Sequence, residues 1–88
     1  MKVLIKKLET RSDAENPDAF LPTDYESTKN INPDKFNKPK VDTCFILHDI
    51  NSMNNYFRSS IIVEILENNE TSGKFKTINS IYYWEILT

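Results

Sequence analysis

Prolines divide this sequence into two unlike parts. All four lie in residues 10–40, among many Asp, Asn, Ser, Thr and Lys residues: Pro17, Pro22, Pro33 and Pro39. Proline lacks a backbone N–H and restricts the residue before it, so each proline interrupts a regular helix or strand. We therefore expect residues 10–40 to form one long loop, and residues 41–88 to hold the regular elements of the core.

The second part alternates between short apolar runs and polar turns, which is typical of β-strands. These runs predict strands at residues 43–48, 58–67, 74–78 and 81–87. In the second of these strands, Ile61, Val63 and Ile65 are expected to form one buried face. A fifth strand, at residues 2–9, carries several lysines and is expected at a sheet edge, where lysine discourages pairing with other chains.

Two turns are expected between the last three strands. Gly73 is the only glycine of the chain, and its freedom to adopt positive φ predicts that it closes the turn of residues 68–73. Asn79 and Ser80 form either a tight two-residue turn, which we favour, or a β-bulge. Because no convincing amphipathic helix is present, we predict a single all-β domain of residues 1–88. Its expected form is a small five-stranded SH3-like or OB-like barrel with a long loop in the N-terminal half.

Composition limits the classes of function. The formal net charge is −2, which does not by itself indicate a nucleic-acid partner. The chain has one cysteine and therefore no intrachain disulfide, and its N-terminal residues lack the apolar stretch of a signal peptide. No apolar run is long enough to cross a bilayer. These features predict a cytoplasmic protein.

Cys44, His48 and Asp49 form the only cluster of reactive residue types in the sequence. On one strand Cys44 and His48 share a face but lie about 13 Å apart, at a rise of about 3.3 Å per residue, which is too far for a hydrogen bond. A serine nucleophile, Ser59 or Ser60, would reach His48 only through tertiary contacts. One cysteine and one histidine cannot supply a closed zinc site, and one glycine cannot build a glycine-rich phosphate loop. We therefore expect a protein that is not an enzyme and that uses no cofactor or metal.

A basic stretch in the loop is the first candidate for binding. It consists of Lys35, Phe36, Lys38 and Lys40. Three lysines beside an aromatic ring could contact phosphates and stack a base. The alternative is a solvated loop whose Phe36 anchors it to the core.

The aromatic run Tyr82, Tyr83 and Trp84 is the second candidate. Strand alternation places Tyr83 on one face and the other two on the opposite face, so part of this aromatic surface is expected to be exposed. Aromatic side chains with a polar tip favour interfaces. Packing in the core is the alternative interpretation.

Two segments of the second half carry a resemblance. Ser59 and Ser60 open one predicted strand, and Thr77-Ile78-Asn79-Ser80-Ile81-Tyr82 follows in the next hairpin. This arrangement resembles a pattern of small bacteriophage and prophage proteins, over about a third of the chain. The resemblance implies a small β fold of mobile-element origin, and it carries no activity with it.

These observations favour a non-enzymatic protein-binding module. Combined with the resemblance, they suggest a phage-encoded inhibitor of a host defence system, similar to an anti-CRISPR protein, acting on a host protein. The alternative is a small barrel that binds nucleic acid or a nucleotide through Lys35, Phe36, Lys38 and Lys40.

Self-association is also expected. The strand at residues 81–87 is apolar on both faces and carries one charge, Glu85. At a sheet edge it would pair with a second copy and form a homodimer, which we slightly favour. The competing arrangement pairs it with residues 2–9 and closes a barrel, which leaves no edge.

Overall fold

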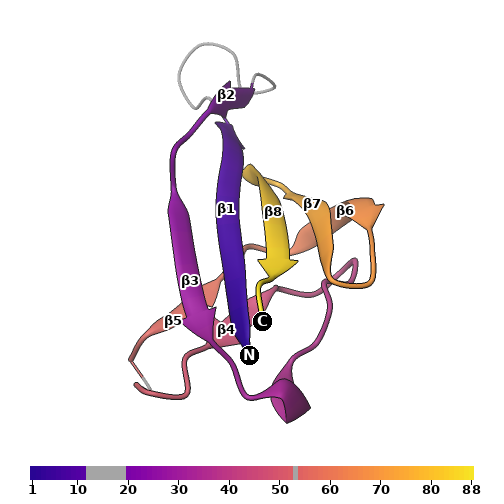
Figure 1. The fold of residues 1–88 in the computed structure, drawn as a ribbon. Coiled ribbons are helices and arrows are strands. Elements are labelled where there is room, and N and C mark those ends of the chain that lie inside the picture. Colours follow the sequence, from indigo (N-terminus) through magenta and orange to yellow (C-terminus); the bar gives the residue numbers. More distant parts are fainter. Residues whose placement is uncertain (12–19, 53) are drawn as a thin grey trace.

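The computed structural model describes residues 1–11, 20–52 and 54–88, and these residues form an all-β fold (Figure 1). The strands are β1 (Lys2–Arg11), β2 (Phe20–Pro22), β3 (Glu26–Asn30), β4 (Ile46–His48), β5 (Tyr56–Arg58), β6 (Ile62–Asn68), β7 (Ser72–Thr77) and β8 (Ser80–Ile86). One short 3-10 turn, η1 (Pro33–Lys35), follows β3. It begins at Asn32, whose side-chain oxygen accepts a hydrogen bond from the N–H of Asp34.

The main sheet has the order β2-β1-β8-β7-β6, with β3 also paired to β1, and all of its neighbours are antiparallel. β1 is long enough to pair with β3 along its first half and with β2 near its end, while β8 lies along its other side (Figure 1). The expectation that residues 2–9 form an edge strand is therefore wrong. Residues 12–19 of the loop expected at residues 10–40 lie outside the described residues, and in the remainder β2 and β3 interrupt the loop.

The β4–β5 hairpin packs on one face of this sheet and encloses the core. Phe45 is central to the packing: its ring centroid lies 5.3 Å from that of Phe75 and 6.1 Å from that of Trp84. The buried apolar residues come from nearly every element: Val3, Ile5, Ile31, Phe45, Leu47, Phe57, Ile62, Phe75, Tyr82 and Trp84. The core is therefore largely aromatic, and the hairpin is held to the sheet by ring contacts.

The strand expected at residues 58–67 is broken into β5 and β6, because this part of the chain changes its pairing partner from β4 to β7. The prediction of which residues of this strand face the core is also wrong. Ile61 and Val63 are exposed and Ile65 is half-buried, whereas Ile62 is fully buried. Register shifts on both sides of the Glu64–Ile65 pair insert extra residues and displace the simple alternation.

The sheet does not close into a barrel within the described residues. β4 approaches β3 at one point, where the N–H of Ile50 donates to the carbonyl of Asn30 at 2.8 Å. The carboxylate of Asp49 adds a second link by accepting the N–H of Asn30 at 3.1 Å. We call these two hydrogen bonds the seam; along the rest of β4, its side away from β5 has no strand partner in the described parts of the chain.

β8 lies between β1 and β7 and so has no free edge. The edge on which the expected homodimer depended is absent. The pairing with residues 2–9 in the competing arrangement is observed, but the closed barrel that this arrangement included is not found in the described residues. Self-association through another surface stays a prediction. The tight turn expected at Asn79 and Ser80 is present one residue earlier, at residues 78 and 79 between β7 and β8, and Ser80 already belongs to β8.

Gly73 has a different role from the one expected. It lies within β7, paired with Asn68 and Trp84, and its φ is not positive. A Cβ at this position would lie 2.6 Å from the carbonyl oxygen of Glu67 and 2.8 Å from Nε1 of Trp84. The chain needs glycine here because the indole of Trp84 occupies the space of a side chain.

Gly73→Ala should therefore destabilise the protein by about 1–3 kcal/mol, the usual cost of forcing an extra methyl group into a filled space. Urea unfolding followed by Trp84 fluorescence measures it. The matched control is Lys74→Ala in the same strand, which removes a 3.6 Å surface ion pair with Glu67 and should cost no more than about 1 kcal/mol. Equal stability of Gly73→Ala and the natural protein would contradict this account.

Candidate functional site

The aromatic run of the last strand is mostly core. Tyr82 and Trp84 are 6% and 1% exposed, so they are not available to a partner. Tyr83 is half-buried on the opposite face of the sheet, and its hydroxyl donates a hydrogen bond to the carboxylate of Glu85 at 2.5 Å. This hydrogen bond raises the pKa of Tyr83, because it stabilises the protonated phenol. The expected aromatic interface on this strand is therefore wrong for Tyr82 and Trp84.

The residues of the basic stretch have two different environments in the structure. Phe36 is half-buried, with its ring centroid 5.7 Å from Trp84 and 6.3 Å from Phe45, so it anchors the loop to the core as the alternative interpretation proposed. Lys35, Lys38 and Lys40 are exposed. The three lysines are thus available to a partner, whereas Phe36, which the sequence analysis grouped with them, packs against the core.

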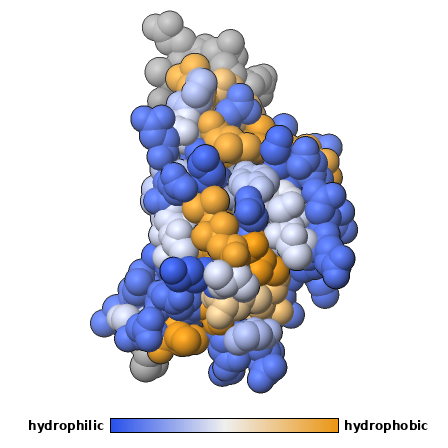
Figure 2. All heavy atoms as spheres, in the orientation of Figure 1, coloured by the Kyte–Doolittle hydropathy of each residue, from blue (hydrophilic) through white to orange (hydrophobic). Residues whose placement is uncertain are grey.

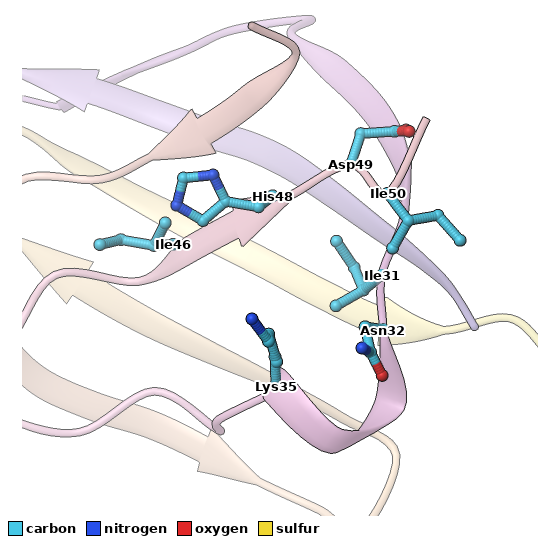
Figure 3. Close-up of a pocket in the computed structure, with 7 residues that line it drawn as sticks. All are labelled: Ile31, Asn32, Lys35, Ile46, His48, Asp49 and Ile50. Atoms are coloured by element: carbon cyan, nitrogen blue, oxygen red, sulfur yellow. The ribbon is translucent and has the colours of Figure 1, made fainter. Parts of the chain in front are cut away.

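A first pocket, of about 440 Å³, lies between η1 and β4 (Figure 3). Its walls come from two segments: Ile31, Asn32 and Lys35 on one side, and Ile46, His48, Asp49 and Ile50 on the other. In Figure 3, the side chain of Lys35 extends from η1 toward β4, across the gap from Ile46 and His48. The pocket is open to solvent, and exposed isoleucine side chains form much of its wall.

A second pocket, of about 300 Å³, continues along the same strand. It is lined by Asn37, Lys38, Lys40, Thr43, Cys44 and Ile46. Ile46 belongs to both pockets, so they form one line of depressions beside β4. The lysines that the sequence singled out all contribute to this line, because the loop after η1 runs opposite β4.

The outer face of the β4–β5 hairpin adjoins the two pockets. Tyr56 is paired with His48, with ring centroids 5.6 Å apart, and Arg58 is paired with Ile46. All four side chains are exposed. We call the combined surface the binding face, and it consists of Lys35, Lys38, Lys40, Ile46, His48, Ile50, Tyr56 and Arg58.

Sequence reasoning missed half of this face. Ile46, Ile50, Tyr56 and Arg58 were not singled out. The available signal was the alternation itself: Phe45 and Leu47 turn inward, which leaves Ile46 to point outward. Ile46 is 44% exposed and Ile50 is 62% exposed.

Asp49 is the one acidic residue that lines the pockets. Its two carboxylate oxygens accept backbone N–H groups, from Asn30 at 3.1 Å and from Asn51 at 2.8 Å. These hydrogen bonds lower the pKa of Asp49, and the positive charge of Lys29 lowers it further. The carboxylate therefore accepts the hydrogen bonds of the seam, and no other acidic side chain among the residues that line the pockets is placed to pair with the lysines.

Cys44 and His48 line different pockets, with Ile46 between them. The two side chains are therefore not arranged as a nucleophile and its base. Across residues 1–11, 20–52 and 54–88, no three His, Cys, Asp or Glu side chains gather closely enough to hold a metal ion. That the protein is not an enzyme stays a prediction.

A second apolar surface lies on the large sheet. Figure 2 shows hydrophobic surface in a band down the middle of the face that carries β1 and β8, with hydrophilic surface on both sides. The apolar side chains of these two strands that do not face the core, Leu4, Leu8 and Ile81, are half-buried by their neighbours. They offer less accessible area than Ile46 and Ile50, so the binding face is the stronger candidate.

No protein-family model, curated protein or solved structure matches this chain. The resemblance of its second half to phage proteins therefore stays a prediction. In the part of the chain that the structure describes, no helix has the length and apolar character needed to cross a membrane.

The lowered pKa of Asp49 makes the seam dependent on pH. Its folded-state pKa lies below the ordinary value of 3.8, so its contribution to stability is complete above that value and is lost as the pH falls through the folded-state pKa. Asp49→Asn should lower the melting temperature near neutral pH, because one of the two N–H groups loses its acceptor. The difference from the natural protein should shrink as the pH falls below 3.8 and through the folded-state pKa. Thermal unfolding followed by circular dichroism over this range measures it, and a difference that is constant with pH would contradict it.

Proposed function

We propose that this protein is a non-enzymatic protein-binding module and that it contacts its partner through the binding face. The observation that carries the proposal is the arrangement of that face. Exposed apolar and aromatic side chains, Ile46, Ile50 and Tyr56, lie together and are bordered by lysines and Arg58. Tyr and Arg side chains around an apolar centre are typical of protein interfaces.

Nucleic-acid binding is the second candidate, and Lys35, Lys38 and Lys40 favour it because they line one surface. Two features weigh against it. Phe36, the ring expected to stack a base, packs against Phe45 and Trp84 instead. The pocket walls also contain exposed isoleucines, which make no favourable contact with phosphate groups but gain from covering by apolar side chains.

The wider setting of this function is proposed on the sequence alone. The phage-like pattern supports a partner in the host cytoplasm, and interference with a host defence system, in the manner of an anti-CRISPR protein, fits a chain of this size. For the fold, the rolled sheet with its seam is compatible with an SH3-like or OB-like barrel that is open along one side of β4. A homodimer stays possible only through a surface other than β8.

Site-specific photocrosslinking in cells tests the proposed function. A photoreactive phenylalanine analogue in place of Tyr56 should give one protein adduct of defined mass, because this position is 54% exposed and belongs to the binding face. The same analogue in place of Thr28, which is exposed on β3, is the matched control and should give none. Adding Ile46→Asp should reduce the yield about tenfold or more.

Two results would count against the proposal. Equal yields at Tyr56 and Thr28 would remove the binding face as the contact surface. Adducts at Tyr56 that contain only nucleic acid, and that disappear steeply with added salt, would replace it with the second candidate.

A further inference from the structure

The backbone of β4 has one edge that is paired and one that is open. The N–H of Asp49 donates to the carbonyl of Asn55 at 3.0 Å, and the N–H of Ser59 donates to the carbonyl of Phe45 at 3.0 Å. Residues 45, 47 and 49 therefore direct their backbone groups toward β5. In an antiparallel pair the intervening residues direct theirs the other way, so Ile46 and His48 present N–H and C=O groups at the opposite edge.

This opposite edge is open between two fixed points. At one end, Ile50 donates to the carbonyl of Asn30. At the other end, Asp42 donates to Ile62 and Ile62 donates to Thr43, so the chain before β4 joins the start of β6. Between these points, the described residues supply no hydrogen-bond partner to the N–H of Ile46 or His48.

The space beside this edge is the line of two pockets. Both are bounded by β4 on one side and by the loop of residues 31–40 on the other, so the loop stands off from the strand. Figure 3 shows this separation, with Asn32 and Lys35 across the gap from Ile46 and His48. The gap thus offers unpaired backbone groups together with two depressions, one on each side of Ile46.

We propose that the open edge of β4 takes up an extended, acidic segment of a partner protein as an added strand. The inference rests on the proposed protein-binding function and specifies how the partner binds. Main-chain hydrogen bonds to Ile46 and His48 hold the segment, and the two pockets receive its side chains. The added strand extends the β4–β5 sheet and fills the opening that the seam leaves beside β4.

Charge determines the kind of segment. Lys35, Lys38 and Lys40 all line the gap, and the carboxylate of Asp49 is already engaged by two backbone N–H groups. Lysines beside an open edge repel basic strands and discourage aggregation. The same lysines attract a strand that carries Asp or Glu, so they select among partners as well as protect the edge.

The edge of β6 does not offer the same opportunity. β6 is also an outer strand of its sheet, but it has two register shifts, which interrupt a regular hydrogen-bonding edge. It carries Glu64 and Glu67, so it would not attract an acidic segment. β4 combines an uninterrupted open edge with positive charge.

Selection from a displayed library of random twelve-residue peptides tests the proposal without knowledge of the natural partner. We expect the enriched peptides to be rich in Asp and Glu. Hydrogen exchange measured by NMR then gives the decisive readout. A bound peptide should slow exchange of the Ile46 and His48 amides by about tenfold or more, whereas the Leu47 amide, already paired with β5, should change little.

Two matched pairs isolate the backbone hydrogen bonds. An enriched peptide with N-methyl groups on alternate amides keeps its side chains but loses donors, and one of the two alternate patterns should abolish binding. On the protein, Ile46→Pro and Ile46→Ala both lose the isoleucine contact, but only proline removes the N–H at the open edge. The proline variant should bind about tenfold more weakly than the alanine variant, which corresponds to about 1.4 kcal/mol. Trp84 fluorescence shows whether both variants fold.

The outcomes separate this inference from the proposed function. Peptides that shift the resonances of Tyr56 and Arg58 but leave Ile46 and His48 exchanging fast would overturn strand addition and leave protein binding in place. No enriched peptide, together with no protein adduct at Tyr56, would overturn both. Enrichment of peptides without acidic residues would overturn the charge assignment. Light scattering that shows a dimer in which the two amides are already protected would assign the edge to a second copy.

Discussion

The hydrogen bonds of Asn30 decide the shape of this protein. Its carbonyl accepts the N–H of Ile50, and its own N–H donates to Asp49, so one residue at the end of β3 holds the end of β4. The edge-to-face and tilted contacts of Phe45 with Phe75 and Trp84 hold the hairpin against the sheet. They do not fix the position of the hairpin along the sheet, since aromatic contacts tolerate sliding more readily than hydrogen bonds do. The seam supplies this position at one end of β4, and the hydrogen bonds between Ile62 and residues 42 and 43 fix the chain at the other end. The open side of β4 lies between these two points, where the described residues provide no strand partner.

A second charged group lies near the seam. Lys29, the residue before Asn30, is only 9% exposed, and its Nζ donates to the side-chain oxygen of Asn55 at 2.7 Å. This links β3 to the turn between β4 and β5, a few residues from the backbone hydrogen bonds of Asn30. A buried ammonium group is costly without partners, so the amide oxygen of Asn55 and the nearby carboxylate of Asp49 are needed to keep Lys29 in place. The polar seam and the aromatic core therefore hold the hairpin at different points.

Much of the fold follows from the sequence, and the exceptions have physical causes. Alternating apolar runs correctly predicted an all-β chain, with strands in the second half, and an anchoring role was correctly weighed for Phe36. β3 could not be found this way, because residues 26–30 contain no apolar side chain: this strand exists because β1 offers it a hydrogen-bonding edge. The inward face of β6 was misjudged because bulges displace its alternation. At the binding face, the lysines were visible in the sequence as a charge pattern. By contrast, only the pairing of β4 with β5 places Ile46 and Tyr56 on one surface.

The long first strand also governs how the molecule responds to force. The start of β1 and the end of β8 lie side by side, where Leu87 donates to the carbonyl of Lys2 and Lys2 donates to the hydroxyl of Thr88 (Figure 1). Tension applied through both ends of the chain therefore acts across the β1–β8 pair and breaks its hydrogen bonds one after another. In a shear geometry, the same hydrogen bonds would bear the force together. β2 and β3 pair with the main sheet only through β1, so separating β1 from β8 also separates them from the rest of that sheet and leaves β3 linked to the hairpin through the seam. A machine that unfolds proteins by pulling on an end meets little mechanical resistance here, even though β1 is the longest and most extensively paired strand in the part of the chain that the structure describes.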